Sequence, residues 1–146
     1  MFMKKTYSQK PVEVDRKWVL VDASEAPLGK VAATIANYLT GKYKTTFTPH
    51  VDGGDFVVVV NAKNLVVTGG KETDKMYYHH SGYQGGLREL TLAEVREKNP
   101  AHIITEAVKG MIPKNKLAPE RLKRLRVFDG EEHSHTAQQP KKVEVK

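Results

Sequence analysis

A run of five apolar residues, Phe56 to Val60 (FVVVV), constrains the fold of this chain more than any other stretch. Every position is apolar, so both faces of a strand formed here must be covered, as in a parallel sheet flanked by helices. An exposed hairpin strand would instead alternate apolar and polar residues. The run is also far shorter than the roughly 20 residues of a membrane-spanning helix. It therefore predicts a buried strand and no membrane association.

Further strand and helix signals lie on either side of this run. Residues 18–22 (WVLVD) are apolar and rich in β-branched side chains, which is typical of a strand. Residues 28–39 are apolar at helical spacing, between a proline and a following glycine. Residues 65–70 (LVVTGG) resemble a strand or a strand end, and residues 75–80 (KMYYHH) a possible fourth strand. The pattern predicts an α/β protein with helices on the faces of a parallel or mixed sheet.

The second half of the chain has clear helix boundaries. Thr91 and Glu94 have the spacing of a capping box, which marks the start of a helix. Asn99 and Pro100 end this helix and begin the next one. We therefore expect two consecutive helices directly after the stretch rich in tyrosine and histidine.

A last helix is expected over about residues 116–125. Ala118, Leu122 and Leu125 form a narrow apolar stripe on its wheel, and basic side chains occupy most of the remaining surface. After a short strand-like RVF, residues 129–146 form a polar tail, for which we expect an extended or partner-ordered conformation.

Size and composition fit one soluble domain. The 146 residues match a typical single domain, and the basic start, residues 1–11, lacks the apolar segment of an export signal. The chain has no cysteine, which excludes disulfides and thiolate metal sites. We expect a cytoplasmic protein with one domain over residues 1–146.

The positive charge is concentrated in two segments. The net charge is +7, and Met1 to Lys10 contributes three lysines. Residues 109–126 contain seven basic residues and one acid, Glu120, which gives +6, so the rest of the chain sums to −2. The seven are Lys109, Lys114, Lys116, Arg121, Lys123, Arg124 and Arg126. Such segregation favours a polyanionic partner, although a basic run is also common on a solvated helix face. Because Lys123 and Arg124 lie off the apolar stripe, we expect both to be exposed.

The stretch DKMYYHHSGYQGG, residues 74–86, is the strongest candidate site. One hypothesis is a metal-dependent hydrolase that uses His79, His80, His133 and His135. Adjacent histidines on a strand point to opposite faces, however, and the HSH stretch has no evident third ligand. Neither the phosphate-binding loop nor the dinucleotide fingerprint has its glycines here. We therefore predict no catalytic residue, no metal, no cofactor and no small-molecule substrate.

The alternative hypothesis is RNA binding. Gly82, Gly85 and Gly86 allow backbone amides to approach phosphates closely, and the neighbouring tyrosines provide rings for stacking. Lysines and an arginine flank the stretch. Segregated charge together with aromatic rings favours this hypothesis over the metal site.

The chain resembles the bacterial ribosomal protein L-thirteen family. The resemblance covers nearly the whole chain and runs through WVLVDASEAPLGKVAATIANYLTGK, TPHVDGGDFVVVVNA, VTGGK, YYHHSGYQGGL, AVKGMIPKNKL and EHSHTAQQP. It implies a three-layer α/β/α fold around a mainly parallel four-stranded sheet, with a basic C-terminal helical extension and polar tails. The function it implies is a non-catalytic constituent of the large ribosomal subunit, in the cytoplasm, that binds large-subunit ribosomal RNA and supports assembly. The implied partners are that RNA and neighbouring large-subunit ribosomal proteins.

One position departs from the family pattern. After PKNKL the family usually continues with Gly-Arg, whereas this chain has Ala118 and Pro119. An arginine contact to RNA is thereby lost, and Arg121 is the expected substitute.

The predicted RNA-binding residues fall on the stretch above, on the two basic segments and on the segment after the first helix. They are Lys4, Lys5, Lys42, Lys44, Lys71, Lys75, Tyr78, His79, His80, Gly82, Tyr83, Gly85, Gly86, Arg88, Lys109, Lys114, Lys116, Arg121, Lys123, Arg124 and Arg126.

Overall fold

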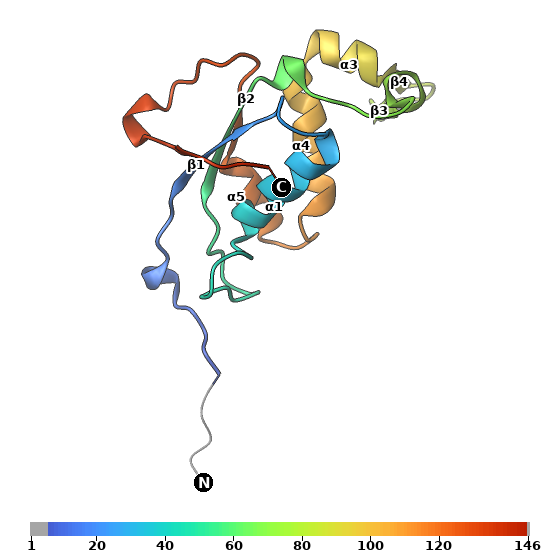
Figure 1. Cartoon of the computed structure of the whole chain (residues 1–146). Coiled ribbons are helices and arrows are strands. Elements are labelled where there is room, and N and C mark those ends of the chain that lie inside the picture. Colours follow the sequence, from blue (N-terminus) through green and yellow to red (C-terminus); the bar gives the residue numbers. More distant parts are fainter. Residues whose placement is uncertain (1–5, 146) are drawn as a thin grey trace.

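A four-stranded parallel sheet forms the centre of the protein. The computed structural model describes residues 6–145 (Figure 1). The strands β1 (Trp18–Asp22), β2 (Phe56–Val60), β5 (Leu125–Val127) and β6 (Lys141–Lys142) lie in the order β5-β2-β1-β6. All three pairings are parallel. The expected mainly parallel sheet of four strands is confirmed.

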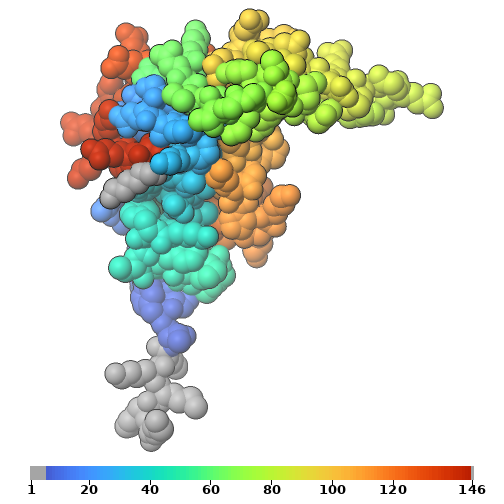
Figure 2. Space-filling model, turned by 45° about the vertical axis from the view of Figure 1, so that its right-hand side comes forward, coloured from blue at the N-terminus to red at the C-terminus, as the bar shows by residue number. Residues whose placement is uncertain are grey.

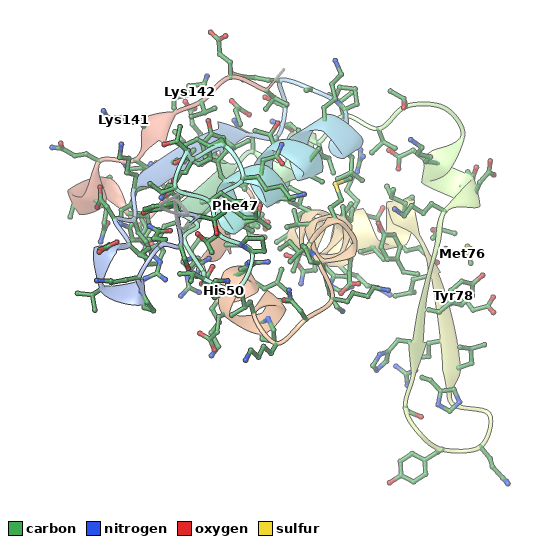
Figure 3. The ribbon with its side chains drawn as sticks, turned by 90° about the horizontal axis from the view of Figure 1, so that it is seen from below. Phe47, His50, Met76, Tyr78, Lys141 and Lys142 are labelled. Carbon is green, nitrogen blue, oxygen red and sulfur yellow. The ribbon has the colours of Figure 1, made fainter. Side chains whose placement is uncertain are left out.

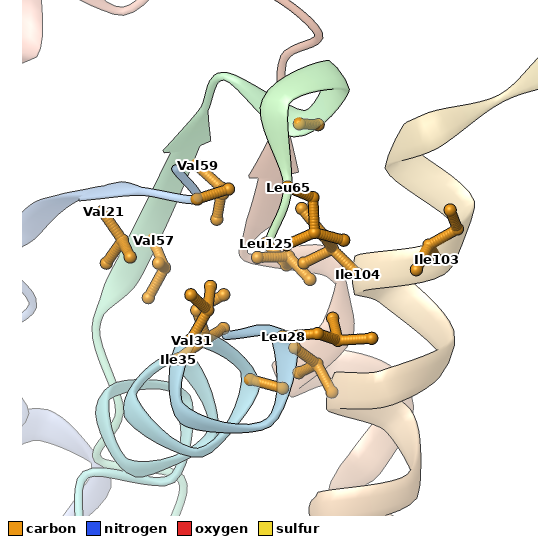
Figure 4. Close-up of a cluster of buried hydrophobic side chains, with 14 of the residues drawn as sticks. Val21, Leu28, Val31, Ile35, Val57, Val59, Leu65, Ile103, Ile104 and Leu125 are labelled. Carbon is orange, nitrogen blue, oxygen red and sulfur yellow. The ribbon is translucent and has the colours of Figure 1, made fainter. Parts of the chain in front are cut away.

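One face of this sheet packs against helices. Val21, Val57 and Val59 point toward helix α1 (Leu28–Thr40) and are fully buried (Figure 4). Helix α4 (Pro100–Met111) packs beside α1 and adds Ile104 to the same cluster. A continuous apolar core therefore joins the two halves of the chain, which were expected to be one domain.

The other face of the sheet is covered by the C-terminal segment. Trp18 and Phe56 stack there with ring centroids 4.4 Å apart, and the ring of His135 lies 4.9 Å from Trp18. The segment contains the short 3-10 helix η3 (Thr136–Gln138) and lies on the side of the sheet away from α1 and α4 (Figure 1). The arrangement is consistent with a three-layer α/β/α fold whose second outer layer is thin.

The predicted helix boundaries are confirmed where a cap defines them. Helix α3 (Leu92–Lys98) begins at Thr91, whose hydroxyl accepts from the backbone of Glu94 while the Glu94 carboxylate accepts from the backbone of Thr91. Helix α4 follows directly, with Asn99 as its N-cap. Helix α5 (Ala118–Lys123) is shorter than the predicted 116–125, because Leu125 leaves the helix and joins β5.

Two strand predictions need correction: residues 75–80 form a strand outside the main sheet, and residues 65–70 form no strand. Residues 75–80 do not supply the fourth strand of the sheet: β3 (Met76–His80) pairs antiparallel with β4 (Leu87–Thr91) in a separate hairpin. Residues 65–70 contribute only an isolated bridge between Val66 and Pro27. The fourth strand is β6, from the polar tail, and it pairs with β1 through backbone groups.

The remaining elements are short, and the N-terminal segment is attached to the body. Helix η1 spans Pro11–Glu13, η2 Ala62–Asn64 and α2 Lys71–Asp74. The backbone N–H of Gln9 donates to the Thr48 hydroxyl at 3.1 Å, so part of the basic N-terminal tail contacts the loop after α1. Among residues 6–145, the model has no helix with the length and apolar character needed to span a bilayer.

Candidate nucleic-acid interface

The hairpin of β3 and β4 projects from the body as an arm. In the space-filling view it extends outward beyond α3 and α4 (Figure 2). Its ladder runs from the pair Met76–Thr91 at the base to the pair His80–Leu87 near the tip. Met76 lies toward the base and Tyr78 further along the arm (Figure 3). The candidate site of the sequence analysis is therefore an exposed two-stranded arm, which we call the arm (residues 76–91).

The tip of the arm depends on its glycines. Gly82 and Gly85 have φ of 87° and 68°, which favours glycine. The turn is closed by hydrogen bonds from Ser81 N to Gly86 O at 3.1 Å and from Gly86 N to Tyr83 O at 3.0 Å. A side chain at Gly86 would place its Cβ 2.1 Å from the Ser81 hydroxyl. The ring of Tyr83 is 81% exposed, so the tip presents an aromatic face to a partner.

The two faces of the arm differ in composition. His79 is paired with Arg88, and this face continues into Tyr77. His80 is paired with Leu87 on the opposite face, together with Tyr78, which is 65% exposed. The adjacent histidines therefore point away from each other, as the sequence predicts for a strand.

The metal hypothesis gains no support from the geometry. His133 and His135 lie in the C-terminal segment, where both pack against the ring of Phe128. In the part of the chain from residue 6 to 145, no three His, Cys, Asp or Glu side chains gather closely enough to hold a metal ion. His80 accepts a hydrogen bond from the Gly82 backbone at 2.9 Å, which gives it a role in the turn.

A groove lies between the base of the arm and helices α3 and α4. Its volume is about 690 Å³, and it is lined by Lys75, Met76, Tyr77, Tyr78, His79, Leu90, Val95, Lys98, Asn99, His102, Glu106, Ala107 and Lys109. Lys75 Nζ lies 5.4 Å from the centroid of the Tyr77 ring, and the His102 ring lies 6.1 Å from it. Burial raises the pKa of Tyr77, and the carboxylate of Glu106 adds to the shift. We call this feature the arm groove.

Most of the basic segment, residues 109–126, is exposed. Lys109, Lys114, Lys116, Lys123 and Arg126 have exposed side chains. Lys109 is paired with Glu106 at 2.9 Å and Lys123 with Glu120 at 2.7 Å, both on their own helices. Such exposed pairs contribute little to stability, about 0.3–0.5 kcal/mol each, so these cations remain accessible to a polyanion.

Two arginines of this segment are not exposed, contrary to expectation. Arg121 and Arg124 are 2% and 7% exposed, and both pair with the carboxylate of Asp52. Arg124 donates from Nη2 to Asp52 at 2.7 Å and to the carbonyl of Leu39 at 3.0 Å. Helical periodicity placed Arg124 off the apolar stripe, but the chain after α5 turns this side chain inward toward the half-buried Asp52.

Asp52 is the acid at the centre of this ion pair. Burial alone would raise its pKa, but hydrogen bonds and charge from Arg124, with further charge from Arg16 and Arg121, hold the pKa below its usual value. The pair joins the loop after α1 to the end of α5 across 72 positions of sequence. Arg121 therefore cannot replace an RNA-binding arginine at position 119, because its guanidinium lies inside.

Another acid, Asp55, is fully buried and fixes the same loop. It accepts from Lys44 Nζ at 2.6 Å and from the hydroxyl of Tyr43, and it is 0% exposed. Gly54 precedes it because a Cβ there would lie 1.8 Å from the carbonyl oxygen of Leu39. The motif VDGGD is therefore a packing junction. Lys44, which we expected at the RNA, is an internal ion-pair partner.

The remaining predicted residues fall into three groups. The arm and the turn before it contain Lys71, Lys75, Tyr78, His79, His80, Gly82, Tyr83, Gly85, Gly86 and Arg88. Lys42 is exposed in the segment after α1. Lys4 and Lys5 lie outside the described residues. Of the predicted residues, the groove brings together Lys75, Tyr78, His79 and Lys109, whereas the tip of the arm and Lys42 lie outside its lining.

The sequence analysis missed two residues of the groove. Lys98 lies at the end of α3, and His102 begins the exposed side of α4. The sequence did contain one relevant signal, the helix boundary at Asn99 and Pro100, where the chain turns so that both residues line the groove. The groove also requires the arm to lie beside this turn, and no periodicity in the sequence predicts the position of the arm.

Comparison with known proteins identifies the family. The model of the family "Ribosomal protein L13" matches residues 16–134. The chain is 52% identical over 141 residues to the "Large ribosomal subunit protein uL13" of Halorhodospira halophila, covering 97% of this chain and 99% of that protein. It is 54% identical over 143 residues to the protein of the same name from Geobacter sulfurreducens, covering 98% and 100%. The corresponding values for Legionella pneumophila (strain Corby) are 52% over 141 residues, 97% and 98%. The arm, the VDGGD junction and the strands β1, β2 and β5 of the parallel sheet lie within the matched region, and this chain belongs to the Ribosomal protein L13 family.

Proposed function

We propose that this protein is a structural, non-catalytic constituent of the large ribosomal subunit that binds large-subunit ribosomal RNA and supports subunit assembly. Membership of the Ribosomal protein L13 family supports this role. The observation that carries the RNA contact is the projecting arm, which presents exposed rings, glycine turns and cations away from the folded body. Side chains of this kind stack on bases and contact phosphates.

The proposed RNA surface consists of exposed residues and of two half-buried ones, Lys75 and Gly86. It includes the arm residues and the cations of two other regions: Lys42, Lys71, Lys75, Tyr78, His79, His80, Gly82, Tyr83, Gly85, Gly86, Arg88, Lys109, Lys114, Lys116, Lys123 and Arg126. Lys44 is left out because it pairs with the buried Asp55. Arg121 and Arg124 are left out because they are buried themselves and pair with Asp52. Lys4 and Lys5 remain predictions from the sequence.

Family membership also supports association with the ribosome in the cytoplasm. We propose that neighbouring large-subunit proteins contact the chain in addition to the RNA. The Ala118-Pro119 departure then removes one RNA contact without replacement, since Arg121 is internal.

Cell fractionation tests the role in the ribosome. A tagged full-length chain, expressed in its own cells and separated on a sucrose gradient, should sediment with the large subunit and with assembled ribosomes. Loss of the protein should cause incomplete large-subunit particles to accumulate. A chain found only in the free-protein fractions would contradict the proposal.

Salt dependence tests the RNA surface. The change Lys114→Ala plus Lys116→Ala removes two exposed cations, so the slope of log affinity against log salt should decrease by about 1 to 2 units with large-subunit ribosomal RNA. The matched control is Lys30→Ala plus Lys63→Ala, two exposed lysines outside the proposed surface. Equal slopes in both double variants would remove residues 114–116 from the RNA contact.

A further inference from the structure

The arm groove contains a polar group that the fold leaves without a partner. The Tyr77 hydroxyl is inaccessible to water and has no hydrogen-bond partner among the described residues. Leaving a buried hydroxyl without a hydrogen-bond partner destabilises the folded state. Tyr77 is one of the residues that line the arm groove, whose volume of about 690 Å³ is within the size range of small-ligand pockets. A small turn of the Tyr77 side chain toward the groove would let a bound ligand satisfy its hydroxyl.

The charges around the groove favour an anion. Lys75 and Lys98 form no ion pair with any acid within residues 6–145, and Lys109 is balanced by Glu106. With neutral histidines, the lining therefore has a net charge of +2, from Lys75, Lys98 and Lys109 against Glu106. The apolar floor is formed by Leu90, Val95 and Ala107 among others, so the groove combines positive edges with an apolar base.

The aromatic groups provide the remaining contact. Tyr77 and His102 lie with ring centroids 6.1 Å apart and planes at 52°, and Tyr78 borders the same groove. Aromatic rings beside free lysines are the side chains that bind an unstacked nucleotide, since the base stacks and the phosphate meets the cations. A protein segment would need an acidic side chain to meet the two unpaired lysines.

We propose that the arm groove binds one unstacked nucleotide of large-subunit ribosomal RNA. The base packs against the rings of Tyr77 and His102, the Tyr77 side chain turns so that its hydroxyl hydrogen-bonds to the base edge, and Lys75 and Lys98 contact the adjoining phosphates. The inference rests on the proposed RNA-binding function. It adds a defined subsite, held between the arm and α3–α4, to a surface that otherwise contacts RNA from outside.

Cross-linking locates the nucleotide. Large-subunit ribosomal RNA containing 4-thiouridine is bound to the full chain and irradiated, and the cross-linked peptides are identified by mass spectrometry. The expected cross-links fall on residues 75–79 and 98–109. The same experiment on purified large subunits, with a protein cross-linker added, reports whether a neighbouring protein occupies the groove instead.

Two pairs of variants test the contacts. Tyr77→Phe removes only the hydroxyl and should weaken RNA binding about fivefold, as loss of one hydrogen bond predicts. Its control is Tyr7→Phe, at a ring that is 61% exposed and outside the groove. Lys98→Glu should weaken binding about tenfold, because it reverses a charge beside a phosphate. Its control is Lys63→Glu, also exposed. Thermal unfolding of each variant verifies that the fold is retained.

The outcomes separate this inference from the proposed function. Failure of the unmodified chain to bind the RNA would contradict both. If the chain binds but Tyr77→Phe and Lys98→Glu behave like their controls, and cross-links fall elsewhere, the nucleotide subsite is wrong while the RNA-binding function stands. Cross-links from the groove to a protein in the purified subunit would also overturn the subsite.

Discussion

Replacing Arg124 by alanine should destabilise the protein far more than replacing its neighbour Lys123. The two side chains differ in environment: Arg124 has 8% of its side chain exposed, and Lys123 has 70%. Arg124 donates to both carboxylate oxygens of Asp52 and to the carbonyl of Leu39 at the end of α1. Lys123 forms an ion pair with Glu120, which is itself exposed.

The magnitude follows from these contacts. Removing one partner of a buried ion pair typically costs about 3–5 kcal/mol. Arg16 and Arg121 still lie 3.7 Å and 3.5 Å from Asp52, and they offset part of this cost. We therefore expect Arg124→Ala to lower the free energy of unfolding by about 3 kcal/mol. Lys123→Ala should lower it by about 0.5 kcal/mol or less.

Urea unfolding of both variants measures the difference in their free energies of unfolding, and thermal unfolding measures Tm. In a chain of this size, each kcal/mol lowers Tm by about 2–4 °C, so Tm should fall by about 6–12 °C for Arg124→Ala. The reasoning would be refuted if Arg124→Ala lowered the free energy of unfolding by no more than about 0.5 kcal/mol beyond Lys123→Ala. A difference of that size is within the spread of ordinary surface substitutions.

The pH dependence provides a second, independent readout. Because the folded pKa of Asp52 is held below the usual value of an aspartate, the contribution of this carboxylate to stability is present above that usual value and is lost as the pH falls through the folded pKa. Arg124→Ala removes the main cause of the low pKa. The variant should therefore lose less stability than the unmodified protein when the pH is lowered below about 5. The difference between the free energies of unfolding of the two proteins should become smaller as the pH falls.

Three further predictions concern packing, capping and the C-terminal segment. Gly54→Ala should prevent stable folding, because the added Cβ would lie 1.8 Å from a backbone oxygen at the end of α1. Gly29→Ala has open space around the added Cβ, so it should raise the free energy of unfolding by about 0.5–1 kcal/mol, measured in urea. Thr91→Ala should cost about 1 kcal/mol, because it removes the side chain that caps α3. His135→Ala should change the fluorescence of Trp18, the only tryptophan, since the two rings lie 4.9 Å apart.

Each of these has a clear contrary result. Equal stability of Gly54→Ala and Gly29→Ala would mean that the loop after α1 is free to move away. An unchanged unfolding midpoint for Thr91→Ala would show that tertiary packing alone fixes the start of α3. Identical emission spectra for His135→Ala and the unmodified protein would show that the C-terminal segment does not pack against Trp18 in solution.

Elements with an apolar period or a capping pattern were predictable from the sequence. The strand β1, its following helix and β2 begin and end close to the expected residues. Burial in β1 and in the helix repeats with the period of the backbone, and β2 is apolar at every position. The start of α3 was predictable because its two capping side chains are neighbours in sequence. In each case the information lies within one turn or one strand.

The arm and β6 were not predictable in this way. The two residues of β6 are Lys141 and Lys142, which have no apolar side chain, and the strand exists because β1 offers an unpaired edge. The arm has mixed side chains on both faces and packs little of its own surface. Its strand character was visible, but its separation from the main sheet depends on partners that periodicity does not specify.

The candidate site shows the same limit. Arginines at 121 and 124 look like surface cations on a helical wheel, since the wheel contains no information about Asp52. A basic residue far along the chain can be neutralised inside the protein by an acid that only the fold brings near. The arm residues were correctly placed together because they are neighbours in sequence.

The pairing of β6 with β1 has a consequence for the order in which the sheet can form. Val19 pairs with Lys141, although all other elements of the described chain except η1 lie between them. Contacts of such long range form slowly, and an unpaired strand edge is a template for pairing with other chains. Until synthesis reaches β6, the β1 edge remains open. The interval between the formation of β1 and the synthesis of β6 is therefore the period in which the nascent protein is most exposed to aggregation.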